Sequence, residues 1–176
     1  AGRPVVLLER TRDGGRKILI SGGGRCNVLP SEMDPRQYVT DSSPATLRNI
    51  LRSWPLASQI RFFEDEVGIP LVREPETGKL FPVSNRARDV RDGLLALATR
   101  RGVSVRFGAT LAGATPRPGG GWLARLDGGE TLRASRLVLA TGGLSVPTTG
   151  SDGTGLALAR ELGHEVHAVY PALTPL

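Results

Sequence analysis

The sequence predicts an α/β layer fold built around a parallel sheet. At several points along the 176-residue chain a helical stretch ends at a glycine, and a short β-rich run follows. These passages lie at residues 1–8, 62–72, 94–107 and 156–169. Helices that alternate with short strands are typical of a sheet covered by helices. With 39% hydrophobic residues, the chain is long enough to bury a core of its own.

The first strand is expected at residues 5–8, an apolar run that ends at Glu9. Ala1 and Gly2 before it are interpreted as the last residue and the glycine stop of a helix that begins elsewhere. The chain has no initiator methionine, since its single Met is Met33.

Helices follow in the middle of the chain. Ser43 can cap a helix with Pro44 at its first position, running towards Arg52. Pro55 ends this helix and begins the next, which is expected to run to residue 67. Apolar residues at helical spacing over 87–98 predict a further helix, with Ser84 or Asn85 as its cap.

The last third of the chain predicts a small antiparallel unit and then a return to α/β structure. Glycine-rich turns at 118–121 and 127–129 separate alternating runs, which predicts a β-meander over about 110–134. Residues 137–140 (Leu-Val-Leu-Ala) predict a buried strand. A helix is expected at 156–162 and a strand at 165–169, before a proline-broken tail at 171–176.

One motif is more specific than the rest. Ser21, Gly22, Gly23, Gly24, Arg25, Cys26 and Asn27 follow a Gly-Gly-Arg-Lys-Ile-Leu-Ile segment, and we call residues 21–27 the glycine loop. Successive glycines leave backbone N–H groups free to approach a ligand. Arg16, Lys17 and Arg25 add positive charge that suits a pyrophosphate. The alternative is a flexible turn, which leaves the Arg, Cys and Asn unexplained.

Glu9 is a candidate ribose-binding acid. A dinucleotide-binding fold presents a carboxylate at a strand end to a pair of ribose hydroxyls. The alternative is a solvated acid at the end of any strand. The companion G-x-G-x-x-G turn lies about 20 residues before such an acid, whereas few residues precede Glu9 here. We therefore expect a fragment whose first strand and phosphate-binding helix are cut away, and whose C-terminal end is also cut.

Thr141, Gly142 and Gly143 form a second glycine turn, directly after the predicted strand at 137–140. Such a turn brings the backbone close to a cofactor, although any tight turn has this composition. A Gly/Thr-rich segment at 147–155 then opens a helix, whose N-terminus can hold anionic oxygens.

Arg25 and Cys26 are the candidate catalytic residues. Cys26 can be a redox or nucleophilic thiol, or a small packing residue, as a lone cysteine often is. His164 and His167 are interpreted as structural. A single cysteine excludes an internal disulfide, and with two histidines it argues against a zinc site.

The net charge of +6 and the pI of 10.6 raise the possibility of nucleic-acid binding. The basic residues are scattered arginines with only two lysines, and few aromatic residues lie among them, which argues against it. No apolar run is long enough to span a bilayer, and no signal peptide is visible. We expect a soluble cytoplasmic protein with no membrane partner.

Taken together, these motifs resemble the HI0933-like flavoprotein family of NAD(P)/FAD-dependent, aminoacetone-oxidase-like oxidoreductases, which includes bile-acid reductase relatives. The resemblance covers nearly the whole chain. It is carried by residues 15–27, by Gly-Lys-Leu-Phe-Pro at 78–82 with Ser84, by Ala-Thr-Gly-Gly at 140–143, by Pro-Thr-Thr-Gly at 147–150 and by Tyr-Pro-Ala-Leu at 170–173.

The resemblance implies a glutathione-reductase-like, Rossmann-type FAD-binding domain over residues 1–170, lacking its first strand. Residues 171–176 would begin the link to an insert domain. It also implies site roles. Glu9 binds the adenosine ribose, and the backbone at Leu111 meets adenine. Arg16, Lys17 and the glycine loop line the pyrophosphate and the flavin, and residues 141–143 approach FAD a second time.

The implied function is that of a fragment of an FAD-dependent oxidoreductase. It would act on a small organic substrate, with NAD(P)H or oxygen as redox partner, and Arg25 would stabilise negative charge near the reduced flavin. One alternative, prompted by the pI, is a flavin-bearing RNA-modifying protein; another is the non-catalytic remnant of a truncated gene. Loss of a central strand would leave unpaired edges. We therefore expect that the 176-residue chain alone neither holds FAD nor turns over.

Overall fold

The computed structural model describes residues 2–170, which form two compact units. The first unit is built mainly from Lys17–Val103, and the second from Pro4–Arg16 and the residues from Ser104 onward. Each unit is described by itself.

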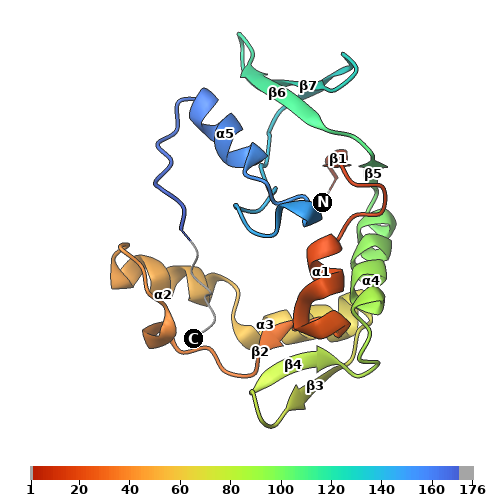
Figure 1. The fold of residues 1–176 in the computed structure, drawn as a ribbon, viewed down its shortest axis with the longest axis vertical. Coiled ribbons are helices and arrows are strands. Elements are labelled where there is room, and N and C mark those ends of the chain that lie inside the picture. Colours follow the sequence, from red (N-terminus) through yellow and green to blue (C-terminus); the bar gives the residue numbers. More distant parts are fainter. Residues whose placement is uncertain (1, 171–176) are drawn as a thin grey trace. The chain divides into compact units, whose positions relative to one another are not determined.

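The first unit combines helices with a small sheet (Figure 1). Its elements in chain order are α1 (Arg16–Ile20, of which Arg16 itself belongs to the second unit), η1 (Ser21–Gly24), β2 (Leu29–Pro30), η2 (Pro35–Gln37), α2 (Pro44–Ser53), α3 (Leu56–Arg61), η3 (Phe62–Val67), β3 (Leu71–Glu74), β4 (Lys79–Pro82) and α4 (Ala87–Arg100).

The predicted helix signals at Ser43 and Pro55 are confirmed. The Ser43 hydroxyl accepts a hydrogen bond from the backbone N–H of Thr46 at 3.2 Å, with Pro44 at the first helical position. Pro55 precedes α3, which continues into the π-helical η3 as far as Val67. Gly68 ends it with a φ of +81°, as expected of a glycine stop.

The sheet of this unit departs from the parallel prediction. Strands β2, β4 and β3 lie in that order, and both neighbouring pairs are antiparallel. The β-rich run predicted at the end of the 62–72 passage forms a strand that begins at Leu71 and pairs with β4 through a short turn that ends at Gly78. A parallel pair needs a crossover of about a dozen residues, so a connection this short permits only a hairpin.

The core of the first unit lies between α4, η3 and the glycine loop. Its buried members are Cys26, Val67, Ile69, Ala87, Val90 and Leu97. Helix α4 therefore follows the predicted apolar spacing, but the predicted cap is wrong. The N-cap is Arg86, with no side-chain hydrogen bond, while Asn85 lies in the preceding turn with a φ of +53°.

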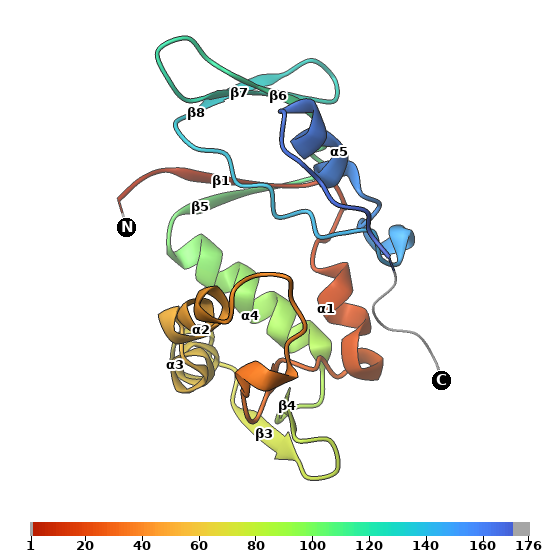
Figure 2. The same cartoon turned by 90° about the vertical axis from the view of Figure 1, so that its left-hand side faces the viewer.

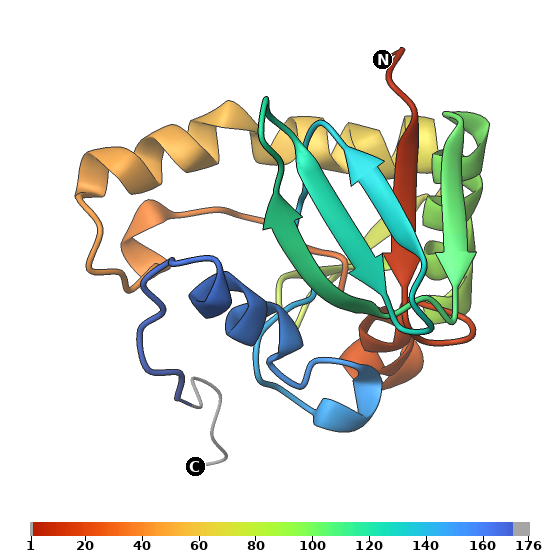
Figure 3. The same ribbon diagram turned by 90° about the horizontal axis from the view of Figure 1, so that it is seen from above.

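The second unit contains two separate sheets. Strand β1 (Val5–Glu9) pairs with β5 (Val103–Phe107), and the two lie side by side in Figure 2. Their arrows point the same way in Figure 3, so this pair has the parallel arrangement predicted for the sheet in general. Strands β6 (Leu111–Pro116), β7 (Trp122–Leu126) and β8 (Thr131–Ala134) form the predicted antiparallel meander.

Two predicted strands of this unit are wrong. Residues 136–143 have no regular structure, and Val138 is 82% exposed rather than buried. No strand among residues 2–170 pairs with this stretch, so its backbone groups gain no ladder of hydrogen bonds. After η4 (Pro147–Thr149) and α5 (Thr154–Glu161), residues 164–170 are likewise irregular, so the strand predicted at 165–169 is absent from the described part.

Several expectations lie partly or wholly outside the described residues. They are the helix end at Ala1, the tail at 171–176 and most of the motif at 170–173. Across residues 2–170, no helix has both the length and the apolar character that a membrane span requires. The same residues hold no group of three or more His, Cys, Asp or Glu suited to a metal ion.

Candidate functional site

Glu9 ends β1 with its carboxylate held in a fixed orientation. Oε1 accepts hydrogen bonds from the backbone N–H and from the hydroxyl of Thr11, both at 2.7 Å. The Thr11 hydroxyl in turn accepts one from the Gly14 N–H at 3.1 Å. Within residues 2–170, Oε2 makes no hydrogen bond that would occupy it. The second oxygen of an oriented carboxylate is thus available to a ligand hydroxyl.

The glycine loop follows α1 directly and adopts a conformation that requires glycine. Gly22, Gly23 and Gly24 have φ values of +57°, +67° and +88°. A Cβ atom on Gly22 would lie 2.8 Å from the Phe81 ring, so internal packing excludes a side chain there. A Cβ on Gly23 would meet nothing within 4 Å, so its bare backbone faces open space. The loop therefore combines a packed end with an open one.

Arg25 fastens the glycine loop to the β3–β4 hairpin. Its Nη1 lies 2.7 Å from Oε1 of Glu74, and its guanidinium carbon lies 4.2 Å from the centre of the Phe81 ring. The hydrogen bond from Arg25 lowers the pKa of the Glu74 carboxyl, with a further contribution from the Thr77 hydroxyl. Arg25 thus already has a structural partner, besides the role expected for it at a cofactor.

Cys26 is buried in the core of the first unit, with 5% of its surface exposed. Burial raises the pKa of its thiol, although a hydrogen bond with Ser21 works in the opposite direction. A buried, protonated thiol is a poor nucleophile, so the structure favours the packing interpretation. Its φ of +67° places it in the left-handed region, like the glycines before it.

Thr141 and Gly142 lie against the segment that opens α5. A Cβ atom on Gly155 would lie 3.1 Å from the Cβ of Thr141, and one on Gly142 would lie 3.1 Å from Oγ of the buried Ser151. Gly143 differs, because its φ is not positive and a Cβ there would meet nothing within 4 Å. Among the described residues, nothing requires glycine at position 143.

The other predicted site residues have simpler surroundings. Leu111 begins β6 opposite Leu126, beside a β-bulge between Leu111 and Gly113. Arg16 starts α1 and makes an exposed ion pair with Asp13, with Nε and Oδ1 3.3 Å apart. Lys17 follows it in α1 and is half-buried.

Sequence reasoning missed Arg10. Its Nη1 lies 2.8 Å from Oδ2 of Asp152, and its Nη2 donates to the carbonyl of Gly150 at 2.9 Å. Hydrogen bonds from the hydroxyl of Thr154 and from Arg10 hold the pKa of the Asp152 carboxyl well below its ordinary range. Arg10 thereby ties the end of β1 to the segment before α5. Its position directly after Glu9 was the one signal in the sequence.

Arg10 also borders an open hollow of about 340 Å³ in the second unit. Its lining includes two further arginines and three threonines: Arg10, Thr11, Arg12, Arg16, Thr110, Pro147, Thr148 and Gly150. The hollow is basic and rich in hydroxyl groups.

The predicted site residues are divided between the two units. The second unit holds Glu9, Arg16, Leu111 and residues 141–143, whereas Lys17 and the glycine loop belong to the first.

Comparisons with known proteins agree with this architecture. Residues 1–169 match the family model described as the HI0933-like protein Rossmann domain. A solved structure, THI4 of Thermovibrio ammonificans, superposes with a TM-score of 0.51 at 19% identity, covering 93% of this chain and 55% of that one. The likeness confirms an α/β, Rossmann-like fold.

Two curated relatives match almost the whole chain. The 3-dehydro-bile acid delta(4,6)-reductase of Clostridium scindens is 34% identical over 98% of this chain and 41% of its own length. The ribosomal RNA dihydrouridine synthase of Escherichia coli is 30% identical over 99% of this chain and 42% of its own length. The chain therefore spans about two fifths of the length of these relatives. Since the family model covers residues 1–169 of 176, the chain belongs to the HI0933-like Rossmann domain family.

Proposed function

We propose that this chain is the FAD-binding part of a flavin-dependent oxidoreductase. The observation that carries the proposal is the geometry of Glu9. Its carboxylate stands at the end of a strand in a parallel pair, oriented through Oε1 by two hydrogen bonds of 2.7 Å, with Oε2 left for a ligand. An acid in this place is the ribose-binding element of Rossmann-type folds.

The remaining residues fit the same cofactor. The open backbone at Gly23 suits an anionic group that approaches N–H donors directly, and Arg16 and Lys17 supply positive charge. Gly143 has no conformational or packing reason within the described chain to be glycine. A cofactor that approaches the backbone of Gly143 would supply a reason for the glycine. Leu111, Thr141, Gly142 and the rest of the glycine loop are proposed to bind the same molecule.

When bound, FAD supplies hydride and electron transfer, and the protein supplies binding and orientation. This chain's part is then to hold the adenosine end through Glu9 and to present backbone donors to the pyrophosphate. We propose NAD(P)H or oxygen as the redox partner and a small organic molecule as the substrate. The reductase from Clostridium scindens is the relative that supports this substrate class.

The test is FAD binding by the protein encoded in the complete open reading frame, with the 176-residue chain alone beside it. We expect the complete product to purify yellow with stoichiometric flavin and the chain alone to be colourless. A complete product that neither carries nor binds FAD would overturn the proposal and favour a non-catalytic remnant. A yellow 176-residue chain would overturn the expectation that it cannot hold FAD by itself.

Glu9→Gln gives a residue-level test. This substitution removes the charged acceptor. The FAD affinity of the complete gene product, measured by fluorescence quenching, should therefore fall about tenfold. The matched control is Glu165→Gln, because Glu165 is exposed and no hydrogen bond or ion pair holds it within residues 2–170. Equal affinities for the two variants would remove Glu9 from the site.

A second candidate substrate is RNA. With this substrate the protein would be a flavin-bearing RNA-modifying enzyme. The dihydrouridine synthase of Escherichia coli and the basic charge of +6 favour it. The two candidates separate when the flavin-loaded product is given NADH or NADPH with either a 3-dehydro-bile acid or ribosomal RNA. If NADH or NADPH is consumed in the presence of only one of these two acceptors, the class of that acceptor is the substrate class.

A further inference from the structure

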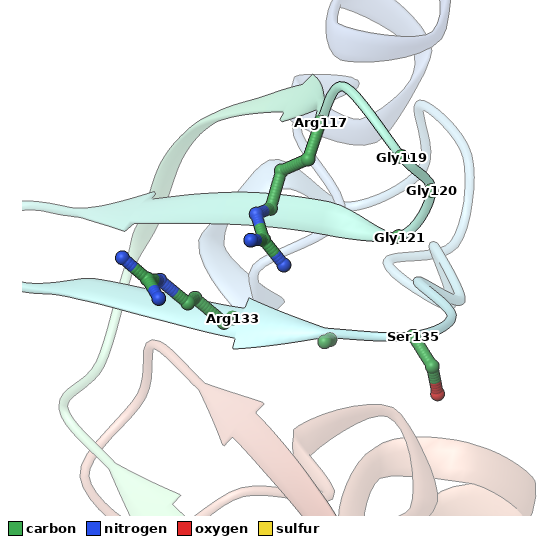
Figure 4. A pocket seen from close by; sticks show the side chains of 7 residues that line it. Arg117, Gly119, Gly120, Gly121, Arg133 and Ser135 are labelled. Atoms are coloured by element: carbon green, nitrogen blue, oxygen red, sulfur yellow. The ribbon is translucent and has the colours of Figure 1, made fainter.

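The meander carries arginines on one face that the cofactor proposal does not use. Cross-strand pairing places Leu123 opposite Arg133 and Arg125 opposite Thr131. Residues two apart in a strand point to the same side of a sheet, so Arg125 and Arg133 share a face. In Figure 4, Arg117 extends from the β6–β7 turn over the same side as Arg133. We call Arg117, Arg125 and Arg133 the arginine face.

Glycines hold this arrangement in place. The backbone N–H of Arg117 donates to the carbonyl of Gly121 at 3.0 Å. A Cβ atom on Gly121 would lie 2.6 Å from the Ala134 carbonyl oxygen, so only glycine lets the turn approach β8 this closely. At the other end of the sheet, the Arg125 guanidinium lies over Gly113, where a Cβ would be 3.1 Å from Nη2.

Arg117 and Arg133 also border a hollow of about 470 Å³ (Figure 4). The rest of its lining is small: Gly119, Gly120, Gly121, Ala134 and Ser135. The hollow is therefore open to a bulky anionic group between two guanidinium groups.

The positive charge of this face is not compensated. All three arginines are exposed, and none makes an ion pair or hydrogen bond through its side chain within residues 2–170. The acids of the meander, Asp127 and Glu130, lie in the β7–β8 turn, and Glu130 is paired with Arg106 at 2.8 Å. The opposite face holds the buried Ala114, Ala124 and Leu126, which fixes the side that the arginines present to solvent.

We propose that the arginine face binds the phosphate backbone of duplex RNA. The proposal rests on RNA as the substrate candidate given above. Guanidinium groups carry a positive charge opposite to that of phosphate, and their forked N–H donors fit two phosphate oxygens at once. The paired residues around Arg125 and Arg133 on this face (Gly113, Thr115, Leu123 and Thr131) include no aromatic side chain to stack unpaired bases. Backbone contact without base stacking is how proteins bind duplex RNA.

The same composition argues against a membrane surface. Insertion at a bilayer interface needs exposed large apolar side chains beside the basic ones. Leu123 is the one large apolar residue among those paired positions, and it is only half-exposed. The face is therefore hydrophilic and basic, which fits a polyanion in water.

Filter binding of a short RNA duplex to the complete gene product tests the proposal. The test variant is Arg117→Gln, Arg125→Gln and Arg133→Gln combined. The control combines Arg48→Gln, Arg52→Gln and Arg88→Gln, which are exposed arginines on α2 and α4 without ion pairs among the described residues. Both triple variants lose three positive charges, so a difference between them reports the position of the charge.

We expect the test variant to bind about tenfold or more weakly, and the slope of log K against log salt to fall by about three between about 50 and 200 mM. The control should lose little. Equal losses of RNA affinity in the two variants, or unchanged RNA affinity in the test variant, would overturn the proposal. So would a test variant that binds anionic vesicles more weakly but binds the RNA duplex as before. Flavin absorbance of the same preparations is read separately, so failure of the cofactor proposal remains distinguishable.

Discussion

Thr141 occupies the space that a side chain at position 155 would need. A Cβ atom on Gly155 would overlap with Oγ1 of Thr141 and would lie 3.1 Å from its Cβ. Gly155 is itself buried in the first turn of α5. The glycine is therefore the feature that lets the turn at 141–143 pack against the helix.

Replacing Gly155 with alanine should destabilise the protein. In a free helix the change would favour folding by about 1 kcal/mol, but overpacking costs about 1–3 kcal/mol and the Thr141 side chain has to move. Urea unfolding measures the difference. The control is Gly143→Ala, where a Cβ meets nothing within 4 Å, and its stability should change by less than about 0.5 kcal/mol. A more stable Gly155→Ala variant would show that the turn does not pack there.

Gly22→Ala should destabilise the protein more than Gly23→Ala, although the two residues are neighbours. Both positions have positive φ, which costs an alanine about 1–2 kcal/mol. At Gly22 the new methyl would also lie 2.8 Å from the Phe81 ring, which is 3% exposed and has no room to shift. Gly22→Ala should therefore lose about 1–3 kcal/mol more in urea unfolding. Equal losses would mean that the glycine loop is not packed on β4.

Local signals predicted much of the fold because a few neighbouring residues determine them. The Ser43 cap depends on one hydrogen bond and the stop at Gly68 on one positive φ, and the turn at 118–121 depends on three successive glycines with positive φ. The meander followed from its turns. The strand at 137–140 failed because a buried strand also needs a neighbour to pair with, and residue composition does not specify one.

The arginine face shows the same limit for function. A search for basic runs finds scattered arginines, and it argued against nucleic acid. Arg117, Arg125 and Arg133 lie eight residues apart in the sequence, close to the nine residues from the start of β7 to the start of β8. The sheet, not the sequence, makes them neighbours. The eight-residue spacing was the available signal, but it has meaning only once the meander is known.

The ion pair of Arg25 with Glu74 predicts a pH dependence. The pKa of Glu74 lies below its ordinary value of 4.5 in the folded state, so its contribution to stability is complete above that pH and is lost as the pH falls below it. Arg25→Gln removes the charged hydrogen-bond donor that contributes most to lowering the Glu74 pKa. The stability difference between wild type and variant should then be largest near neutral pH and shrink below about 4.5.

Urea unfolding across this pH range measures that difference, with Arg88→Gln as the control for loss of an exposed arginine. The Arg25 side chain is 43% exposed, so added salt should reduce the effect. A difference that stays constant with pH would mean that Arg25 stabilises the loop through Phe81 alone.

Cys26 gives a direct test between packing and chemistry. Its thiol is 5% exposed, and burial raises its pKa, so little thiolate exists at neutral pH and a reagent cannot reach it. A thiol-specific chromogenic reagent should therefore react slowly with the native protein and rapidly after unfolding in urea. The core around the Cys26 side chain is formed by Val67, Ile69, Ala87, Val90 and Leu97, so FAD at the backbone of the glycine loop should not speed the reaction. Rapid labelling of the native protein at neutral pH would instead require an accessible thiolate, and it would restore Cys26 as a nucleophile beside the cofactor.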